Sequence, residues 1–452
     1  MKKTLYIGFF LSALCLLPFA CRRDTSAIEP DNYQAATVLV QKWHELLLEL
    51  ERHTPGYRPP VTARMWSLVE LAAWQAALPG VPEAIGLEKY LDGLPDAPTY
   101  SGLYNLPAGL NAAYAEIFRQ FFPTAPPHLF EKIELLETEQ LNQIKSQANP
   151  ANLAQSIAYG KKTALDIWRW SATDAFGHEG FLFNFDRGYV SPECTGCWKP
   201  GGAHPMPALL PYWGKSRSLL VAPSTVEVTP PLAYDEKPGS PFHVQAMELF
   251  AMSKPLSNEH RWIAEFWSDD VPGLTNSPMG RWISITNQAV AQADLPFPQL
   301  LELYLKAAMA STDVMVICWK SKYAFYLERP EAYIRRVVDP NWTPLHDNPP
   351  FPSYPSGHAA IGAAVTEVLT AFLGESFPLT DRTHEGRTEF IGKPRTYSSF
   401  REMARENALS RLALGVHYRM DCDEGLRLGK LVSKRVTALP CRKQDARISW
   451  SR

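Results

Sequence analysis

The sequence lacks several features that mark common protein classes. Lysine plus arginine number 45 and aspartate plus glutamate number 47, so the formal net charge is −2 and the basic excess typical of nucleic-acid binders is absent. After the first 20 residues, no apolar run reaches the roughly 18 residues of a membrane span. We find no internal repeat, and alternating strand patterns are brief. These absences argue against a nucleic-acid binder, a solenoid and a fold rich in strands.

The first residues resemble an export signal. Lys2 and Lys3 precede an apolar run from Leu5 to Ala20, which is too short to span a bilayer comfortably. Cys21 follows directly, as at the cleavage site of a bacterial lipoprotein, where the cysteine becomes the lipidated first residue. We therefore expect residues 1–21 to be a signal peptide of the lipoprotein type. The mature chain would lie in the periplasm or at the cell surface, and would contact a membrane only through a lipid anchor at Cys21.

Helical patterns dominate the rest of the chain. The 452 residues include 39 prolines, which predicts short helices joined by stiff loops. Amphipathic stretches cover residues 33–50, 65–77, 110–122, 130–148, 151–170, 244–266, 279–293, 298–324, 358–373, 400–415 and 424–438. We expect an all-α fold of two linked helical bundles. The N-terminal bundle covers residues 31–176, a loop rich in proline and glycine covers 177–230, and the C-terminal bundle covers 231–440.

The first of three motifs in the C-terminal half pairs two cations. Lys322 and Arg329 are seven residues apart, nearly two helical turns, so we expect them on one face of a helix that ends at Pro330. Such cations repel each other unless an anion lies between them. A solvated basic face is the simpler interpretation, but apolar Ile317 and Tyr323 flank the pair.

The second motif is Pro355-Ser356-Gly357-His358, followed by a run of small apolar residues. Ser356 is a candidate helix N-cap, and Gly357 leaves its backbone N–H accessible, so this helix start can hold an oxyanion. His358 can exchange a proton near neutral pH. A capped helix without a ligand is the alternative.

The third motif contains Arg411, His417 and Asp421. On a helix, Asp421 can orient the imidazole of His417 four residues earlier and raise its basicity. Each motif alone is more often structural than catalytic. Together they predict a site for a tetrahedral oxyanion that passes through five-coordination, in the core of the C-terminal bundle. A zinc site is not expected, because zinc needs three or four clustered neutral or anionic ligands and this set is rich in cations.

The ordered set of motifs resembles the type 2 phosphatidic acid phosphatase superfamily, which includes the vanadium-dependent haloperoxidases. Segments 211–215, 266–270, 351–358 and 414–421 resemble the haloperoxidase branch. The resemblance implies that His417 bonds vanadium axially, that His358 assists peroxide activation, and that Asp269 or Asp270 orients Arg411. It also implies that vanadate accepts hydrogen bonds from Lys322, Arg329, Ser356, Gly357 and Arg411.

The resemblance leaves three functions open. A haloperoxidase would use vanadate and hydrogen peroxide to oxidise halide, with Trp319 and Phe351 forming an apolar halide pocket as in chloride-oxidising relatives. A phosphatase would hold phosphate in the same site and hydrolyse a phosphoester through a phosphohistidine at His417. The third function is anion binding without turnover. We favour the haloperoxidase, although Glu328 is expected to lower the positive potential beside Arg329.

Two further features lie outside these motifs. Cys194 and Cys197 do not fit haem attachment, because Trp198 stands where histidine is required, and no second cysteine pair has zinc-binding spacing. In an exported protein we expect them to form a local disulfide. His346 precedes the Phe351 loop and is a candidate for the site entrance, with a solvated loop histidine as the simpler interpretation.

Overall fold

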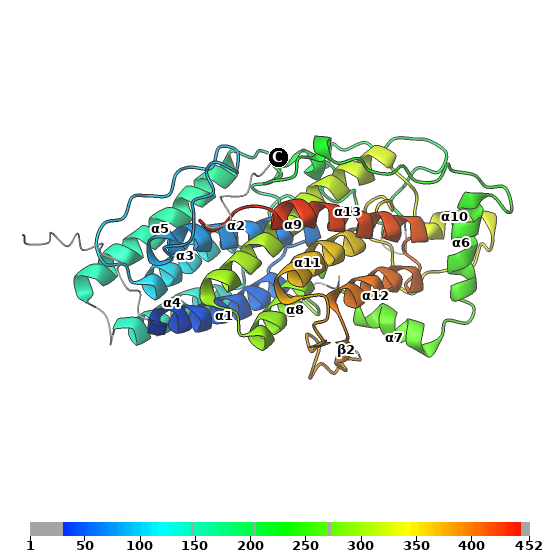
Figure 1. Cartoon of the computed structure of the whole chain (residues 1–452). Helices are drawn as coiled ribbons and strands as arrows, with labels where there is room; N and C mark the ends of the chain where they lie inside the picture. Colours follow the sequence, from blue (N-terminus) through cyan, green and yellow to red (C-terminus); the bar gives the residue numbers. More distant parts are fainter. Residues whose placement is uncertain are drawn as a thin grey trace, which may run out of the picture.

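The computed structural model describes residues 30–145, 149–201, 205–269, 271, 273–389 and 391–443. The expected signal peptide and Cys21 lie outside the described residues. The described residues form thirteen α-helices and one two-stranded antiparallel sheet. The predicted all-α fold is therefore confirmed (Figure 1).

Five helices precede the long connection at residues 173–240, and eight follow it. The first five are α1 (Pro30–His53), α2 (Pro59–Ala77), α3 (Leu106–Phe121), α4 (Pro127–Lys145) and α5 (Pro150–Ala172). The next five are α6 (Pro241–Met252), α7 (Asn258–Phe266), α8 (Pro278–Ala293), α9 (Phe297–Phe325) and α10 (Pro330–Val337). The last elements are α11 (Gly357–Leu373), β1 (Leu379–Asp381), β2 (Arg395–Tyr397), α12 (Phe400–Ala413) and α13 (Arg419–Thr437).

Many of the prolines begin helices. A proline occupies the first or second position of α2, α3, α5, α6, α8, α9 and α10, where its missing N–H costs no helical hydrogen bond. Serine side chains cap several of the same starts, as Ser240 and Ser277 do for α6 and α8.

Three local predictions were wrong or incomplete. The single helix expected over 244–266 is divided into α6 and α7, with Pro255 in the segment between them. Helix α13 begins at Arg419, five residues before the predicted start. Helix α10 and the β1–β2 pair were not predicted, because each is too short to show a clear hydrophobic period.

Helices α2 and α9 join the two sets of helices. All 19 residues of α2 are buried, and it packs against α3, α5 and α9. The 29-residue α9 in turn packs against α11 and α13 and crosses the middle of the molecule (Figure 1). The largest apolar core extends from Ala36 in α1 to Cys441 beyond α13, so both sets of helices share it. The division into two bundles at residues 177–230 stays a prediction.

A buried carboxylate fixes the long connection to α9. Asp313 accepts hydrogen bonds from the backbone N–H groups of Leu219, Leu220 and Val221, at 2.5–2.8 Å. Burial nevertheless raises the pKa of Asp313 to about 6. This anchor holds the connection against the helix that carries Trp319 and Lys322.

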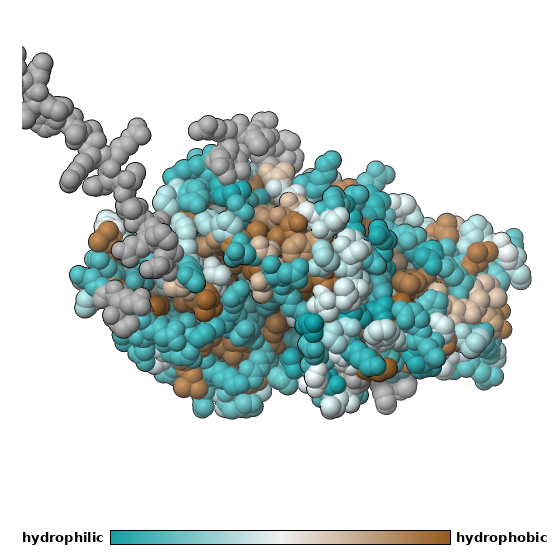
Figure 2. Space-filling model, turned by 60° about the horizontal axis from the view of Figure 1, so that its bottom comes forward, coloured by the Kyte–Doolittle hydropathy of each residue, from teal (hydrophilic) through white to brown (hydrophobic). Residues whose placement is uncertain are grey.

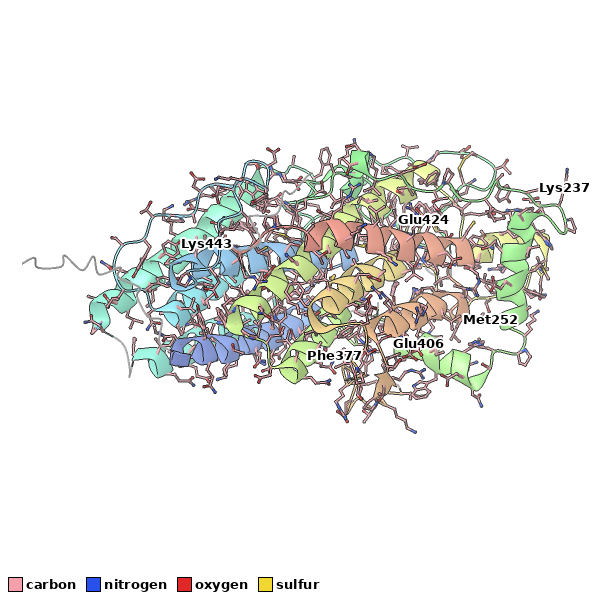
Figure 3. All side chains as sticks on the ribbon, in the orientation of Figure 1. Lys237, Met252, Phe377, Glu406, Glu424 and Lys443 are labelled. Atoms are coloured by element: carbon pink, nitrogen blue, oxygen red, sulfur yellow. A yellow bond between two sulfur atoms is a disulfide. The ribbon has the colours of Figure 1, made fainter. Side chains whose placement is uncertain are left out.

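Ion pairs hold the β1–β2 pair to the helices: Asp381 bonds Arg281 of α8, and Arg395 bonds Glu406 of α12. Glu406 of α12, labelled in Figure 3, accepts hydrogen bonds from Tyr397 Oη and Arg395 Nη2, each at 2.6 Å. On the face drawn in Figure 2, apolar residues lie in separate groups among hydrophilic ones. Among the described residues, no helix is both long and apolar enough to cross a membrane.

Candidate oxyanion site

The site lies where the ends of five helices meet. Lys322 is in the last turn of α9, and Arg411 is in the last turn of α12. The other groups come from helix starts: Arg329 precedes α10, Ser356 caps α11 ahead of Gly357 and His358, and His417 and Asp421 flank the start of α13. The N-termini of α10, α11 and α13 add their positive dipole ends to the cationic side chains.

The structure corrects the helix geometry predicted for two pairs of site residues. Lys322 and Arg329 do not share a helix face, because Tyr326 adopts a left-handed conformation with φ of 53° and ends α9. Pro330 begins α10 instead of ending a helix. His417 likewise precedes α13, and Asp421 reaches back to it from the first helical turn as part of the N-terminal cap. The pairing is as predicted, but its geometry is that of a helix start.

Hydrogen bonds define the tautomer of His417. Arg329 Nη1 lies 3.1 Å from His417 Nε2, and because a guanidinium can only donate, Nε2 must be the acceptor. His417 Nδ1 therefore carries the proton and donates it to Asp421 Oδ2 at 2.8 Å. The Nε2 lone pair therefore faces the cations, and an electrophilic atom that bonds it would take the place of the Arg329 hydrogen bond.

Ser353 is a buried site residue that sequence reasoning missed. Its hydroxyl donates to Asp421 Oδ2 at 2.5 Å, so the carboxylate is held from two sides. Lys322 Nζ donates to the carbonyls of Pro352 and Ser353 at 3.0 and 2.8 Å, which ties the end of α9 to the same loop. The Phe-Pro-Ser-Tyr-Pro segment was singled out only as a resemblance, and the spacing of Ser353 from Asp421 gives no sign of contact.

The electrostatics of the site favour an anion. Burial and the charges of Arg411, Lys322 and Arg329 hold the pKa of His358 well below its usual range, and the same influences lower the pKa of His417. Burial lowers the pKa of Lys322 to about 7. The three cations therefore lie close together in a buried volume, where removing their charges from water has a large free-energy cost.

Burial also raises the pKa of Asp421 to about 6, so this carboxylate is ionised at neutral pH. It is one negative charge against the three cations of the predicted shell. His358 Nε2 is buried and has no hydrogen-bond partner among the described residues. A tetrahedral oxyanion would supply both the missing charge and the missing partner, so these residues fit vanadate or phosphate.

The two predicted halide-pocket residues lie together. The rings of Trp319 and Phe351 are 4.9 Å apart between centroids, and both are buried. Lys322 Nζ lies 5.0 Å and the Arg329 guanidinium 4.9 Å from the Phe351 centroid. The aromatic pair therefore forms an apolar wall directly beside the cations.

Other sequence predictions have mixed outcomes. Asp269 was one of two candidates to orient Arg411. It instead forms ion pairs with Arg281 at 3.2 Å and His384 at 3.1 Å. Asp270, the alternative partner, lies outside the described residues. The predicted Cys194–Cys197 disulfide is present.

Glu328 and His346 were also singled out from the sequence, and both lie near the site. Glu328 pairs with Arg336 at 2.6 Å, so its charge is compensated away from Arg329 and the expected loss of positive potential is not supported. His346 lines a cavity of about 420 Å³ that also contains Arg411 and Phe351, as proposed for the entrance. It contacts Ser268 at 3.0 Å and Glu265 at 3.1 Å.

Comparison with known proteins relates this chain to one group of proteins. Residues 302–443 match the family described as the VCPO second helical-bundle domain. The chain is 26% identical to the vanadium chloroperoxidase of Curvularia inaequalis over 34% of this chain and 35% of that protein. The chain thus resembles the vanadium haloperoxidases. The matched region spans about a third of the chloroperoxidase's own length.

Solved haloperoxidase structures share the fold. The first bacterial vanadium-dependent iodoperoxidase superposes with a TM-score of 0.77 at 24% identity, covering 90% of this chain and 97% of that one. A holo-type bacterial vanadium-dependent chloroperoxidase superposes with a TM-score of 0.67 at 17% identity, covering 85% and 92%. The haloperoxidase fold therefore extends well beyond the region of family match, to the N-terminal helices.

Proposed function

We propose that this chain is a haloperoxidase that uses bound vanadate and hydrogen peroxide to oxidise halide. The observation that carries the proposal is a buried, oriented His417 facing three cations of the oxyanion site. Vanadate in that site would supply a Lewis acid that withdraws charge from peroxide. Lys322, Arg329, Ser356, Gly357 and Arg411 would hold it.

The residues of the chain have separate tasks in this proposal. Asp421 and Ser353 keep the His417 ring in one orientation and one tautomer, so that Nε2 stays an acceptor. The guanidinium groups of Arg329 and Arg411 stabilise negative charge, and Lys322, whose pKa burial lowers to about 7, does so in its ammonium form. His358 is neutral at pH 7, and its unpartnered Nε2 can accept a proton from entering peroxide.

The halide would lie against Trp319 and Phe351. An apolar wall removes water from the anion, and the neighbouring cations keep it bound despite that loss. Which halide is oxidised is left to experiment. We also propose that the chain works outside the cytoplasm, in line with its N-terminal sequence and with the Cys194–Cys197 disulfide.

The test is a vanadate titration of the purified full chain with two activities measured in parallel. One is peroxide- and bromide-dependent halogenation of a dye, and the other is hydrolysis of an aryl phosphate. We expect vanadate to switch on halogenation and His417→Ala to abolish it. His128→Ala changes an exposed histidine on α4 and is the matched control.

The other outcomes identify the competing functions. Hydrolysis without vanadate, suppressed when vanadate is added, would make the chain a phosphatase that uses the same residues. Binding of phosphate or vanadate with neither activity would leave an anion-binding protein. Either result would overturn the haloperoxidase proposal.

A further inference from the structure

A second, larger cavity borders the site at Arg329. It has a volume of about 670 Å³ and lies between the Cys194–Cys197 loop and α10. Arg329, which bonds His417, forms part of its wall. Met206 and residues 347–350 line both this cavity and the 420 Å³ cavity that contains Arg411. The two cavities are therefore neighbours, one with Arg329 and the other with Arg411 in its wall.

The charges around the larger cavity cancel one another. Its lining holds four acidic and four basic side chains, and most of them are paired. Arg336 bonds Glu328 at 2.6 Å and Glu236 at 2.9 Å, and Arg335 bonds Glu331 at 3.2 Å. The smaller cavity instead has two arginines against one aspartate. An anion is thus attracted to the smaller cavity, whereas the larger one offers no net charge.

The remaining lining of the larger cavity is largely apolar. The disulfide, Trp198, Met206, Pro349 and Pro350 supply flat or polarisable surfaces that suit an aromatic ring. Asn348 adds one polar group: its Nδ2 donates to Glu331 at 2.6 Å, while its buried Oδ1 has no partner among the described residues. An O–H or N–H group on a bound molecule could donate a hydrogen bond to this unpartnered Oδ1.

We propose that the 670 Å³ cavity binds a neutral, electron-rich aromatic alcohol or amine as the acceptor of oxidised halogen. This inference rests on the proposed haloperoxidase function. Hypohalous acid formed at the oxyanion site would transfer its halogen to a ring carbon, with the O–X bond breaking as the C–X bond forms. The ring proton leaves with the hydroxide as water. A bound acceptor beside Arg329 would react before the oxidant escapes.

The first experiment measures binding of 2-naphthol to the full chain by calorimetry, without vanadate, peroxide or halide. We expect saturable binding that weakens at least roughly tenfold in Ala332→Trp, because the indole would occupy part of the cavity that the 2-naphthol ring needs. Ala332 is an exposed position of α10, so the larger side chain needs no repacking of the core. Ala154→Trp, at an exposed position of α5, is the matched control and should bind 2-naphthol as the parent chain does.

A second variant tests the chemistry of recognition. Asn348→Leu should weaken 2-naphthol but leave 2-methoxynaphthalene, which has no donor, at its original affinity. Unchanged 2-naphthol binding in both variants, or no saturable binding by the parent chain, would overturn the proposal. Halide oxidation measured alone separates the two hypotheses. Oxidation without 2-naphthol binding rejects only the acceptor cavity. Binding of 2-naphthol without oxidation rejects the proposed function and with it the acceptor role, and leaves only a cavity that binds an aromatic ring.

Discussion

His44 of α1 and Glu70 of α2 lie in a buried polar cluster that also includes residues of α3, α8 and α9 and contrasts with the oxyanion site. His44 Nε2 lies 2.8 Å from Glu70 Oε1 and its Nδ1 lies 3.0 Å from Asn287 Oδ1. Tyr114 donates to Glu70 and Tyr304 donates to Asn287. We call these five residues the His44 cluster. Its polar groups satisfy one another, so it needs nothing from solution.

The oxyanion site shares the same kinds of groups but leaves them unbalanced. It also contains a histidine bonded to a carboxylate, yet three cations face that pair and His358 Nε2 has no partner among the described residues. The comparison shows that burial of polar groups does not by itself indicate a functional site. The useful sign is an excess of one charge together with an incomplete set of hydrogen bonds.

The largest expected effect concerns pH and anion binding. Sulfate keeps one charge state between pH 7 and 9, so only the protein titrates. The pKa values of His358 and His417 lie well below 6.5, and that of Asp421 is about 6, so these groups have titrated below pH 7. The pKa of Cys318 is about 11, above the range. Lys322, with a pKa of about 7, is therefore the group of this set that loses its proton as pH rises from 7 to 9. Sulfate binding requires the ammonium form. The affinity of the protein for sulfate should therefore fall as pH rises above 7, by roughly tenfold per pH unit.

Calorimetric titration with sulfate at several pH values measures this slope. Lys322→Met should bind sulfate weakly at pH 7 and show little further change up to pH 9. A parent chain whose affinity is flat over the same range would mean that Lys322 stays charged in the empty site. The excess of positive charge that separates the oxyanion site from the His44 cluster would then persist over this whole pH range.

The second effect is on stability and belongs to the His44 cluster. Glu70→Ala leaves His44 and Tyr114 without their buried partner, which should cost about 1–3 kcal/mol of unfolding free energy. Urea unfolding measures this loss, and sulfate affinity should not change. Glu139→Ala breaks an exposed pair with Lys42 and is expected to cost less than about 1 kcal/mol. Equal losses in the two variants would contradict the role given to the cluster.

Local sequence predicted much of the site, because several of its groups are helix caps. Ser356 caps α11, as predicted, and capping depends on a few adjacent residues. Asp421 was predicted from its four-residue spacing to His417, and that pairing is kept although Asp421 lies in the capping box at the start of α13. Arg329 was assigned to the wrong element because Tyr326, a non-glycine residue, takes the left-handed conformation that ends α9. That ending depends on contacts made by distant residues.

Ser353 and the shared core were beyond sequence reasoning for a related reason. Ser353 meets Asp421 only because the loop before α11 folds across the start of α13. The contact of α2 with α9 likewise joins residues more than 200 positions apart, and a hydrophobic period shows which face is buried but not its partner.

The smallest expected effect concerns how Arg329 is held. The disulfide loop bonds the linker between Lys322 and Arg329: Trp198 N–H donates to Tyr326 O at 2.8 Å, and Glu328 N–H donates to Gly196 O at 2.9 Å. Arg329 also donates to the carbonyls of Phe351 and Val416, so the loop supports a group already partly fixed. Loss of the disulfide should therefore weaken sulfate binding only about threefold, within the net worth of one hydrogen bond.

Replacing both Cys194 and Cys197 with serine tests this support. The double variant should bind sulfate more weakly than the parent chain and should not respond to dithiothreitol, whereas the parent chain should fall to the same affinity when dithiothreitol reduces it. Equal affinities under all conditions would mean that the carbonyls of Phe351 and Val416 alone position Arg329. In that case the disulfide would serve only the neighbouring 670 Å³ cavity. The oxyanion site would then resemble the His44 cluster in being fixed by its own hydrogen bonds, and would differ from it in its excess of positive charge and in His358 Nε2, which has no partner in the part of the chain that the structure describes.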